Sequence, residues 1–290
     1  MTAYPLNDKK TEPENTMELD REFNFTNKDF MFIRDLVAEQ TGIALSEAKT
    51  HMVYSRLARR LRSLNIPSFA QYCDYLTNDG SDELVHFINA LTTNLTAFFR
   101  EKHHFEFLAK TVLPHIFAAK SEKRIRIWSA GCSTGEEPYS IAMVLQECLP
   151  TNCDWDVKIL ATDLDSNVVD KASSGIYEQS RVNGMSAQRM QRFFQKNRFN
   201  NQVKVKPEVR DLITFKQLNL MHSWPMKGHF DFIFCRNVVI YFNKETQKKL
   251  FKRFADLTMD KGYLFIGHSE SLFKVSTQYE LIGNTIYQKS

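Results

Sequence analysis

The 290-residue chain has no long apolar segment and no recognisable cysteine pattern. No apolar run approaches the roughly 20 residues that cross a bilayer, and the polar N-terminus MTAYPLNDKKTEPENT lacks the apolar core of a secretion signal. Five cysteines without a CxxC pair indicate neither a disulfide framework nor a zinc site. The histidines show no metal-binding spacing such as HExxH; they include His103, His104, His222, His229 and His268. These absences predict a cytoplasmic protein with reduced thiols, no membrane insertion and no bound metal.

The sequence also lacks the common signatures of phosphate binding. It contains neither the dinucleotide fingerprint GxGxxG nor the Gly-Lys-Ser/Thr of a P-loop. The net charge of +4 is too small to indicate a nucleic-acid binder by itself. With 43% hydrophobic and 25% charged residues, the chain has the composition of an ordinary globular protein, and its length suits one large or two modest domains.

What the sequence does contain is a strand, a glycine turn and a helix within Ile125–Ser140, IRIWSAGCSTGEEPYS. Its first residues, IRIW, form a short run of strand-forming residues. A turn with Gly131 and Gly135 follows, where the missing Cβ lets the backbone approach a ligand. Glu136–Pro138 then begins a helix, because acids and proline are favoured in the first turn. Such a unit is how a doubly wound sheet presents a nucleotide-like ligand.

The acidic residues of this region indicate what kind of ligand fits. Glu136 and Glu137 would oppose a phosphate at the helix N-terminus, but they suit a ligand with positive groups. S-adenosylmethionine, which carries an ammonium and a sulfonium and no phosphate, meets this requirement; an ordinary βα turn without a ligand is the alternative. A second strand, Val157–Thr162, ends at Asp163, where an acid commonly holds a ribose diol. Capping of the next helix is the alternative role for Asp163.

Strands and helices alternate through most of the C-terminal part. Further strands are predicted at Leu212–Leu218, Phe230–Cys235, Gly262–Gly267 and Thr285–Gln288, and helices at Lys102–Ala119, Ser166–Ser174 and Lys244–Leu257. This alternation predicts an α/β fold with a largely parallel sheet covered by helices on both faces. A segment at about 177–211, with a helix at Ser186–Phe194 and a strand at Val203–Lys206, interrupts the pattern and is predicted to be an inserted subdomain.

The N-terminal part contains only helical patterns. Residues 1–22 are polar and are predicted to form a disordered tail. Residues 23–90 are predicted to form an all-α domain of four helices, the first beginning after Thr26 and ending at Gly42. The α/β domain then comprises residues 91–290.

The second helix of the all-α domain, about Ser46–Leu64, has one basic face. Its five cations are Lys49, Arg56, Arg59, Arg60 and Arg62, and no acid lies between positions 49 and 64. Its apolar residues fall on the opposite face at 100° per residue. The basic face is either ordinary solvated surface or an electrostatic docking surface for an acidic partner.

Five stretches, taken in order, resemble the chemotaxis receptor methyltransferases, the CheR family. They are NALTTNLTAFFR (Asn89–Arg100), WSAGCSTGEEPYSIA (Trp128–Ala142), ATDLD (Ala161–Asp165), FCRNVVIYF (Phe234–Phe242) and GHSESL (Gly267–Leu272). The resemblance covers nearly the whole chain after the tail. It implies an all-α N-terminal domain joined to a Rossmann-like S-adenosylmethionine-dependent methyltransferase domain with a small inserted β-subdomain.

The resemblance also implies an activity and a set of site residues. The family methylates glutamate side chains on the cytoplasmic helices of chemoreceptors, which yields glutamyl methyl esters and S-adenosylhomocysteine. The implied cofactor contacts are Asn94, Thr96, Arg100, Glu137, Asp163, Asn219, Leu220, Arg236 and Asn237, to which the glycine turn adds Gly131. Arg100 and Tyr241 are expected nearest the transferred methyl group. Because receptor methylation regions are acidic helical bundles, the resemblance favours the docking role for the basic helix.

One departure from the family and two other functions are visible in the sequence. The polar turn between Phe194 and Val203 is short and lacks glycine, unlike the longer loop of members that bind a receptor's C-terminal peptide. The stretch NVVIY at Asn237–Tyr241 faintly resembles the Asn/Asp-Pro-Pro-Tyr element of nucleic-acid amino-methyltransferases, but without its prolines. A non-catalytic S-adenosylmethionine-binding signalling protein is the other possibility. We expect receptor helices as partners, no nucleic acid, and a monomer.

Overall fold

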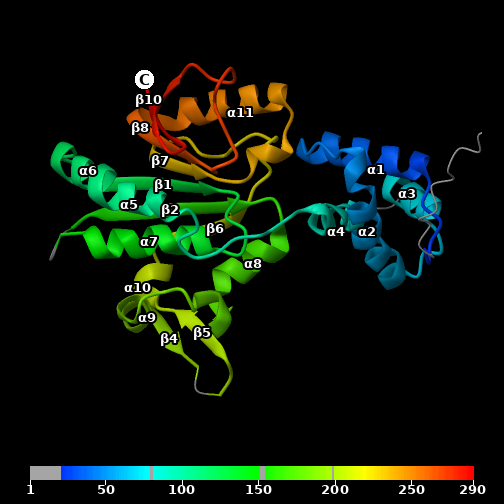
Figure 1. Ribbon diagram of the computed structural model, residues 1–290, viewed down its shortest axis with the longest axis horizontal. Coiled ribbons are helices and arrows are strands. Elements are labelled where there is room, and N and C mark those ends of the chain that lie inside the picture. The colour runs from blue at the N-terminus through cyan, green and yellow to red at the C-terminus, as the bar shows by residue number, and fades with distance from the viewer. Residues whose placement is uncertain (1–20, 79–80, 151–153, 198) are drawn as a thin grey trace, which may run out of the picture.

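The computed structural model describes residues 21–78, 81–150, 154–197 and 199–290, so the predicted tail lies outside it except for Arg21 and Glu22. A group of helices lies at one end of the long axis of the molecule, and a sheet covered by helices occupies the rest (Figure 1). None of the helices in these ranges is long and apolar enough to cross a membrane.

The N-terminal domain is helical, as predicted. Its elements are α1 (Asn27–Thr41), the 3-10 turn η1 (Glu47–Lys49), α2 (Thr50–Leu64), α3 (Phe69–Asn78) and α4 (Ser81–Leu91). Thr26 and Asp29 form a capping box, because Asp29 N donates to Thr26 Oγ1 at 3.2 Å and Thr26 N donates to Asp29 Oδ2 at 2.8 Å. Gly42 ends α1 with a φ of 75°.

The C-terminal domain is organised by a seven-stranded sheet of order β6-β2-β1-β7-β8-β10-β9. The strands are β1 (Arg124–Ala130), β2 (Asp156–Asp163), β6 (Ile213–Gln217), β7 (Phe230–Cys235), β8 (Thr258–Ile266), β9 (Tyr279–Gly283) and β10 (Ile286–Lys289). The first five strands in this order pair in parallel, whereas β10 is antiparallel to both of its neighbours. The sequence did not predict β9, whose central side chains are exposed at the sheet edge and therefore show no apolar alternation.

Helices cover both faces of this sheet. They are α5 (Lys102–Phe107), η2 (Leu108–Val112), α6 (Leu113–Ala119), α7 (Glu136–Cys148), α8 (Ser166–Ser174), α10 (Pro207–Arg210), η4 (Val239–Tyr241) and α11 (Lys244–Leu257). The helix predicted over Lys102–Ala119 forms, but its central turn is a π-helix just before Pro114. Proline has no N–H to donate to the preceding turn, which accounts for the irregularity.

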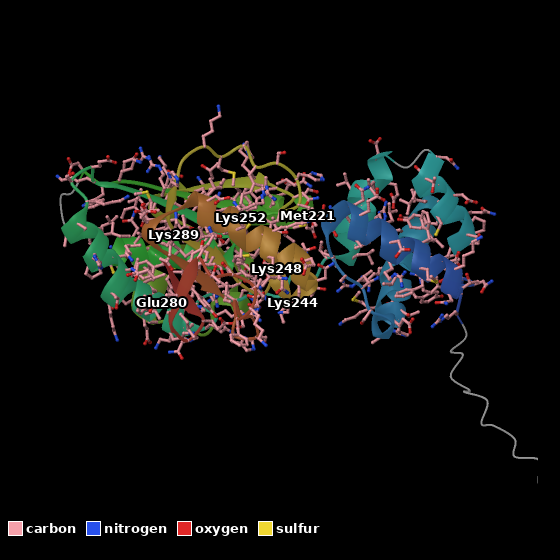
Figure 2. The ribbon with its side chains drawn as sticks, turned by 90° about the horizontal axis from the view of Figure 1, so that it is seen from above. Met221, Lys244, Lys248, Lys252, Glu280 and Lys289 are labelled. Atoms are coloured by element: carbon pink, nitrogen blue, oxygen red, sulfur yellow. The ribbon has the colours of Figure 1, made fainter. Side chains whose placement is uncertain are left out.

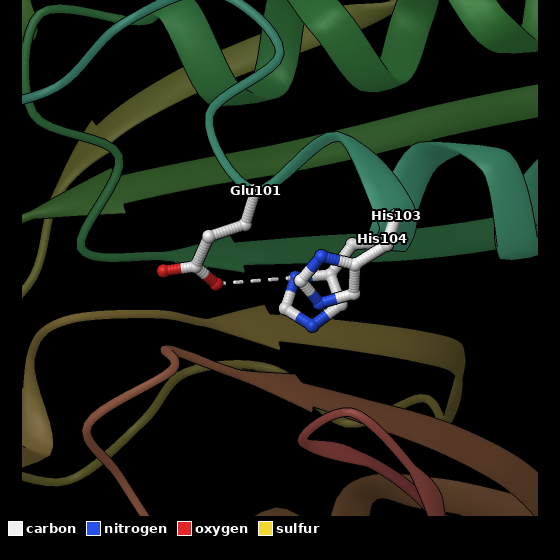
Figure 3. A group of neighbouring side chains, drawn as sticks. All are labelled: Glu101, His103 and His104. Carbon is white, nitrogen blue, oxygen red and sulfur yellow. Dashed lines mark ion pairs between the residues drawn. The ribbon is translucent and has the colours of Figure 1, made fainter.

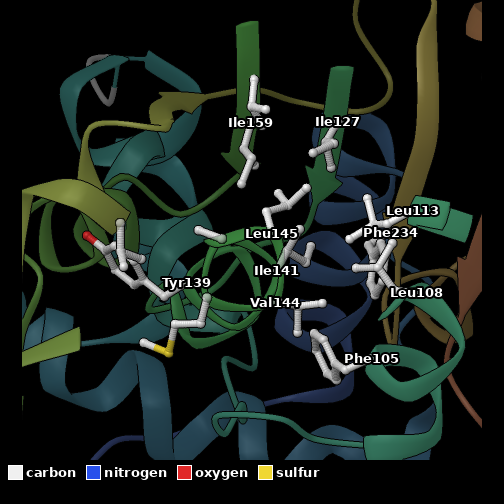
Figure 4. Close-up of a cluster of buried hydrophobic side chains, with 14 of the residues drawn as sticks. Phe105, Leu108, Leu113, Ile127, Tyr139, Ile141, Val144, Leu145, Ile159 and Phe234 are labelled. Atoms are coloured by element: carbon white, nitrogen blue, oxygen red, sulfur yellow. The ribbon is translucent and has the colours of Figure 1, made fainter. Parts of the chain in front are cut away.

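Each sheet face has its own apolar core. On one face, α7 packs Ile141, Val144 and Leu145 against β1, β2 and β7, together with Phe105 of α5 (Figure 4). On the other face, α11 buries Phe251 and Phe254 against Trp128 of β1. The outer face of α11 carries Lys244, Lys248 and Lys252, which are exposed (Figure 2).

The predicted insertion is a small separate subdomain. It contains β3 (Ile176–Glu178), η3 (Gln179–Val182), α9 (Ala187–Phe193), β4 (Phe194–Lys196) and β5 (Gln202–Val205). Its three strands form an antiparallel sheet of order β3-β5-β4, of which the sequence predicted only the middle strand. Since β3 and β4 have three residues each, they are too short to show a strand period.

Candidate active site

A cavity of about 480 Å³ lies where the parallel strands of the sheet end. Its walls include residues that directly follow β1, β2, β6 and β7, and residues 41–52 of the N-terminal domain form another wall. Ligands of doubly wound sheets bind in this position, outside the carboxyl ends of the strands. All the predicted cofactor-binding and catalytic residues line it: Asn94, Thr96, Arg100, Gly131, Glu137, Asp163, Asn219, Leu220, Arg236, Asn237 and Tyr241.

The glycine turn after β1 is needed for packing within the protein. Gly131 has a φ of 85°, and a Cβ added there would lie 2.3 Å from Val238 Cγ2 in the loop after β7. Gly135 has a φ of 95°, and its Cβ would lie 2.8 Å from Ala172 Cβ. The sequence predicted that the missing Cβ lets a ligand approach the backbone. In the structure, protein atoms of Val238 and Ala172 occupy the space beside these two glycines. Both glycines also adopt the left-handed conformation that favours glycine.

Asp163 joins the glycine turn to the end of β2. It is buried, with Oδ2 accepting from Ser133 N at 2.8 Å and Oδ1 accepting from Asp165 N at 3.0 Å. Burial raises the pKa of Asp163, although these backbone donors oppose the shift. The residue that caps the following helix α8 is Asp165, whose Oδ1 accepts from Asn167 N. The capping role considered for Asp163 therefore belongs to its neighbour.

We expect Asp163→Ala to weaken S-adenosylmethionine binding, because the variant loses the acceptor proposed for the ribose hydroxyls. A lost hydrogen bond to a charged group costs roughly 1.5–3 kcal/mol. Isothermal titration calorimetry would measure the affinity, and thermal melting without cofactor would show whether the glycine turn survives. Wild-type affinity in a folded Asp163→Ala protein would remove the ribose assignment.

Glu137 and Arg236, which both line the cavity, form a buried ion pair. Glu137 Oε2 lies 3.1 Å from Arg236 Nη1, and Glu137 Oε1 accepts from Ser129 Oγ at 2.7 Å. Burial raises the pKa of Glu137, and Arg236 together with Ser129 opposes that shift. The carboxylate thus has one strong partner on each oxygen, which positions it in the cavity wall.

The turn that carries Arg100 has unusual backbone geometry. Phe99 and Glu101, on either side of Arg100, have φ values of 53° and 56°, which are costly for residues with a Cβ. Several contacts hold the turn: the Arg236 guanidinium donates to the Arg100 carbonyl, Arg100 Nη1 donates to Leu95 O at 2.9 Å, and Phe99 N donates to Ser140 Oγ at 2.9 Å. Within the described ranges, the Arg100 guanidinium has no carboxylate partner.

Glu101 is the centre of a cluster of cations and histidines that the sequence did not predict. Its Oε2 lies 3.5 Å from His104 Nδ1 (Figure 3). The same oxygen lies 3.2 Å from Arg236 Nη2, and Oε1 lies 2.8 Å from His268 Nδ1. Glu101, His103 and His104 bring possible metal-ligand atoms within 4.8 Å of one another. Arg236, however, contacts the same Glu101 oxygen that faces His104. The carboxylate therefore already has a cation partner, and we assign the cluster to support of the Arg100 turn.

The pKa values in this cluster follow from burial and from Arg236. Burial opposes ionisation of Glu101, but the His268 hydrogen bond and the Arg236 guanidinium hold its pKa at about 2. Burial, reinforced by Arg236, lowers the pKa of His104 to about 4. His104 Nε2 lies 3.0 Å from the Asn284 carbonyl, which only accepts, so the proton of the neutral ring lies on Nε2.

His104 should make the protein less stable as the pH falls from about 6.5 to about 4. In this window the unfolded state binds a proton on His104 that the folded state excludes, so the free energy of unfolding decreases with falling pH. Urea unfolding over a pH series would measure this effect, with His104→Gln as the variant that lacks the titration. The wild type should lose more stability than the variant across the window. Parallel pH profiles for the two proteins would contradict the assignment.

Glu270 shapes the loop after β7, and the sequence analysis missed it. Its buried carboxylate accepts from the backbone N–H groups of residues 237–240 and of Gly267, at 2.5–3.3 Å. These contacts hold Asn237 at a φ of 59°. Gly267 leaves room for the Asn237 side chain, because a Cβ at position 267 would lie 2.3 Å from Asn237 Nδ2. Glu270 stood within the quoted stretch GHSESL, but no local pattern showed that its partners were distant backbone groups.

Three predicted residues join separate parts of the chain across the site. Asn94 Nδ2 donates to Asp165 Oδ2 at 2.7 Å, which fixes the linker to the end of β2. Asn219 Nδ2 donates to Gln40 O at 2.7 Å, and the Tyr241 carbonyl accepts from Ala44 N at 2.8 Å. Asn219 and Tyr241 thereby attach the N-terminal domain to the cavity.

The predicted basic helix comprises η1, which contains Lys49, and α2, and its cations have internal and external roles. Arg56 donates to the Leu91 and Thr92 carbonyls at 3.0 and 2.6 Å, and Arg60 pairs with buried Glu83 at 2.6 Å. Arg62 pairs with Glu22 at the exposed surface. Lys49 lines the cavity, and Arg59 is exposed; neither has an ion-pair partner in the described part of the chain. The helix thus offers Lys49 and Arg59 for a partner, while Arg56 and Arg60 stabilise the domain.

This sheet order, with acids at the start of α7 and at the end of β2, defines a doubly wound α/β protein. The sequence has no phosphate-binding turn, and the cavity suits an adenosine cofactor with positive groups. Family models identify it further. Residues 94–288 match the CheR methyltransferase SAM-binding domain, and residues 28–92 match the CheR methyltransferase all-alpha domain. The chain therefore belongs to the CheR methyltransferase family, the enzymes that methylate with S-adenosylmethionine in chemotaxis.

Relatives support the same assignment over nearly the full chain. Chemotaxis protein methyltransferase 2 of Pseudomonas aeruginosa is 44% identical over 270 residues, which covers 92% of this chain and 95% of the relative. The chemotaxis protein methyltransferase of Escherichia coli is 41% identical over 279 residues, covering 94% of this chain and 95% of the relative. These matches confirm the methyltransferase fold and the cofactor expected from the sequence.

Proposed function

We propose that this enzyme methylates glutamate side chains on the cytoplasmic helices of chemoreceptors. The observation that carries the proposal is the Arg100 guanidinium, which lines the cofactor cavity and has no carboxylate partner among the described residues. A planar guanidinium binds a carboxylate through two parallel hydrogen bonds. Arg100 is therefore suited to receive the glutamate that is to be methylated.

The cavity residues fit the cofactor. The cavity wall presents the carboxylates of Glu137 and Asp163, which suit an ammonium group and a ribose diol. When bound, S-adenosylmethionine supplies an electrophilic methyl group on a sulfonium. We assign Asn94, Thr96, Gly131, Leu220 and Asn237 to the walls that hold it. Asn219 and Arg236 act by holding these walls in place.

The reaction needs no general base. A glutamate side chain has a pKa of about 4.3, so it is already an anion at neutral pH. One of its oxygens attacks the methyl carbon while the carbon–sulfur bond breaks and its electron pair stays on sulfur. A carboxylate and a sulfonium become an ester and a thioether, so the charges cancel. The site therefore has to align the two groups and exclude water. We assign alignment to Arg100, with Tyr241 donating a hydrogen bond beside it.

The reaction is tested by incubating the enzyme with radiolabelled cofactor and receptor-containing membranes. We expect label on the receptor that is released as volatile methanol in base, because esters hydrolyse and N-methyl groups do not. Base-stable label on added DNA would instead support an amino-methyltransferase. Cofactor binding without turnover on any receptor would support a non-catalytic signalling role.

Lys49 and Arg59 form the proposed docking surface for the acidic receptor bundle. We expect the double variant Lys49→Glu/Arg59→Glu to raise the apparent KM for receptor by roughly tenfold or more, since like charges at an interface are repulsive. Cofactor affinity should be unchanged. Lys248→Glu/Lys252→Glu, which alters the net charge equally on the outer face of α11 (Figure 2), is the control. A docking surface is ruled out if both variants retain the wild-type KM at low salt.

We further infer that the enzyme works as a monomer in the cytoplasm, where the receptor domains lie, and does not act on nucleic acid. Five residues, 197–201, separate β4 from β5 in the sequence, and none of them is glycine. Recognition through the receptor helices, without a C-terminal peptide tether, is consistent with this short turn. Light scattering and a pull-down with receptor lacking its C-terminal peptide would test these points.

A further inference from the structure

Two exposed apolar side chains stand at the cavity. Leu95 is 76% exposed and Ile240 is 47% exposed, yet both line the cavity. Other exposed apolar residues of the described chain, such as Phe273, Leu281 and Ile282, lie away from it. Apolar groups that remain in water beside a catalytic site favour contact with another molecule.

Both residues are held on well-fixed backbone beside the proposed catalytic groups. The Leu95 carbonyl accepts from Arg100 Nη1 at 2.9 Å, which joins the Leu95 backbone to that side chain. Ile240 precedes Tyr241 in η4, and its N–H donates to Glu270 Oε1 at 3.3 Å. Leu95 and Ile240, which we define as the apolar rim, thus lie beside Arg100 and Tyr241, the two groups assigned to substrate alignment.

The neighbouring wall adds charge to the apolar rim. Lys49 and Met52 of the N-terminal domain line the same cavity, and Lys49 has no ion-pair partner in the described ranges. The mouth of the cavity thus combines a free cation with apolar contact area. This combination complements an amphipathic helix that carries acids together with small or apolar residues.

We propose that Leu95 and Ile240 bind the receptor helix around the target glutamate and select glutamates with apolar neighbours. The inference rests on the proposed receptor-glutamate activity. On a helix, residues three and four positions from a glutamate lie about 5–6 Å from it on the same face. With the glutamate inserted toward Arg100, those neighbours contact the rim. Apolar neighbours gain buried area there, whereas charged neighbours lose their hydration.

The test compares Leu95→Ser/Ile240→Ser with Leu281→Ser/Ile282→Ser. The control pair has the same residue types, and Ile282 is 46% exposed. We expect the rim variant to raise the KM for receptor roughly tenfold, about 1.4 kcal/mol, with an unchanged cofactor Kd and melting temperature. The control pair should leave KM unchanged.

A second arm replaces the apolar receptor residues three and four positions from one methylated glutamate with aspartate. This change should reduce methylation by the wild type much more than by the rim variant.

The outcomes separate this inference from the proposed function. If the wild type forms no base-labile receptor methyl ester, the proposed function fails. If the wild type does so and the rim variant keeps the wild-type KM, only the rim assignment is overturned. A higher cofactor Kd in the rim variant would show that Leu95 and Ile240 contact the cofactor. An equal increase of KM in the control pair would show a non-specific effect. Each of these two results also overturns the assignment.

Discussion

Replacing Arg236 by methionine is expected to lower the free energy of unfolding by about 3–5 kcal/mol, the cost of leaving a buried charge without its partner. Arg236 is 6% exposed and contacts the carboxylates of Glu101 and Glu137 and the carbonyl of Arg100. Without the guanidinium, the carboxylates of Glu101 and Glu137 lose a positive partner. The turn at Phe99–Glu101 also loses the hydrogen bond to the Arg100 carbonyl. Urea unfolding at neutral pH would measure the loss, and calorimetry would show weaker cofactor binding.

Two matched variants make this expectation specific to the buried network. Arg62→Met removes a guanidinium whose partner, Glu22, is exposed, and it should cost no more than about 1 kcal/mol. Adding Glu137→Gln to Arg236→Met should recover part of the lost stability, because glutamine carries no charge to compensate. A loss from Arg236→Met as small as that from Arg62→Met would show that the network does not stabilise the fold.

Arg100→Ala is expected to reduce turnover on receptor at least about tenfold, which corresponds to about 1.4 kcal/mol of transition-state stabilisation. The variant loses the guanidinium proposed to align the glutamate carboxylate. Because the Arg100 side chain donates only to the Leu95 carbonyl in the described structure, the fold should survive its loss. Turnover at saturating receptor and cofactor, together with the cofactor Kd, would measure the effect.

Arg100→Lys is the informative control for this role. It keeps the charge but loses the planar fork, so it should restore receptor binding more than turnover. If turnover in Arg100→Ala equals that of the wild type, Arg100 does not align the substrate. A fall in cofactor affinity without a change in turnover would assign Arg100 to cofactor binding alone.

The strand-end positions were the most predictable part of the site. A buried parallel strand shows in the sequence as an apolar run, and the residue after it lies at the ligand-binding edge. This rule placed Asp163 at the cavity, and β7 and α11 have the predicted bounds, Phe230–Cys235 and Lys244–Leu257. The strands β3, β4 and β9 escaped prediction because they are short or lie at an edge, where neither burial nor length produces a period.

The helical pattern of the basic helix did not reveal which of its cations have partners inside the protein. The five cations of the predicted helix, which are Lys49 of η1 and four arginines of α2, look equivalent in sequence. In the structure Arg56 binds linker carbonyls and Arg60 binds buried Glu83. Helix α4 and the linker after it pack beside α2, and they decide which cations have an internal partner. Residues 23–36 positions away in the chain supply those partners, and no local pattern encodes such a distance.

The sequence by itself determined the α/β class, the helical N-terminal domain and the strand-end position of Asp163, because strand periods, glycine turns and strand-end acids are local signals. Most of the other cavity-lining residues were implied by the resemblance to the CheR family. Only the tertiary structure decided how these residues are held. The Arg236 network, the Glu270 carboxylate below residues 237–240, and the wall supplied by residues 41–52 join segments far apart in the chain. Their partners are chosen by packing across the sheet and between domains, and such contacts leave no period in the sequence.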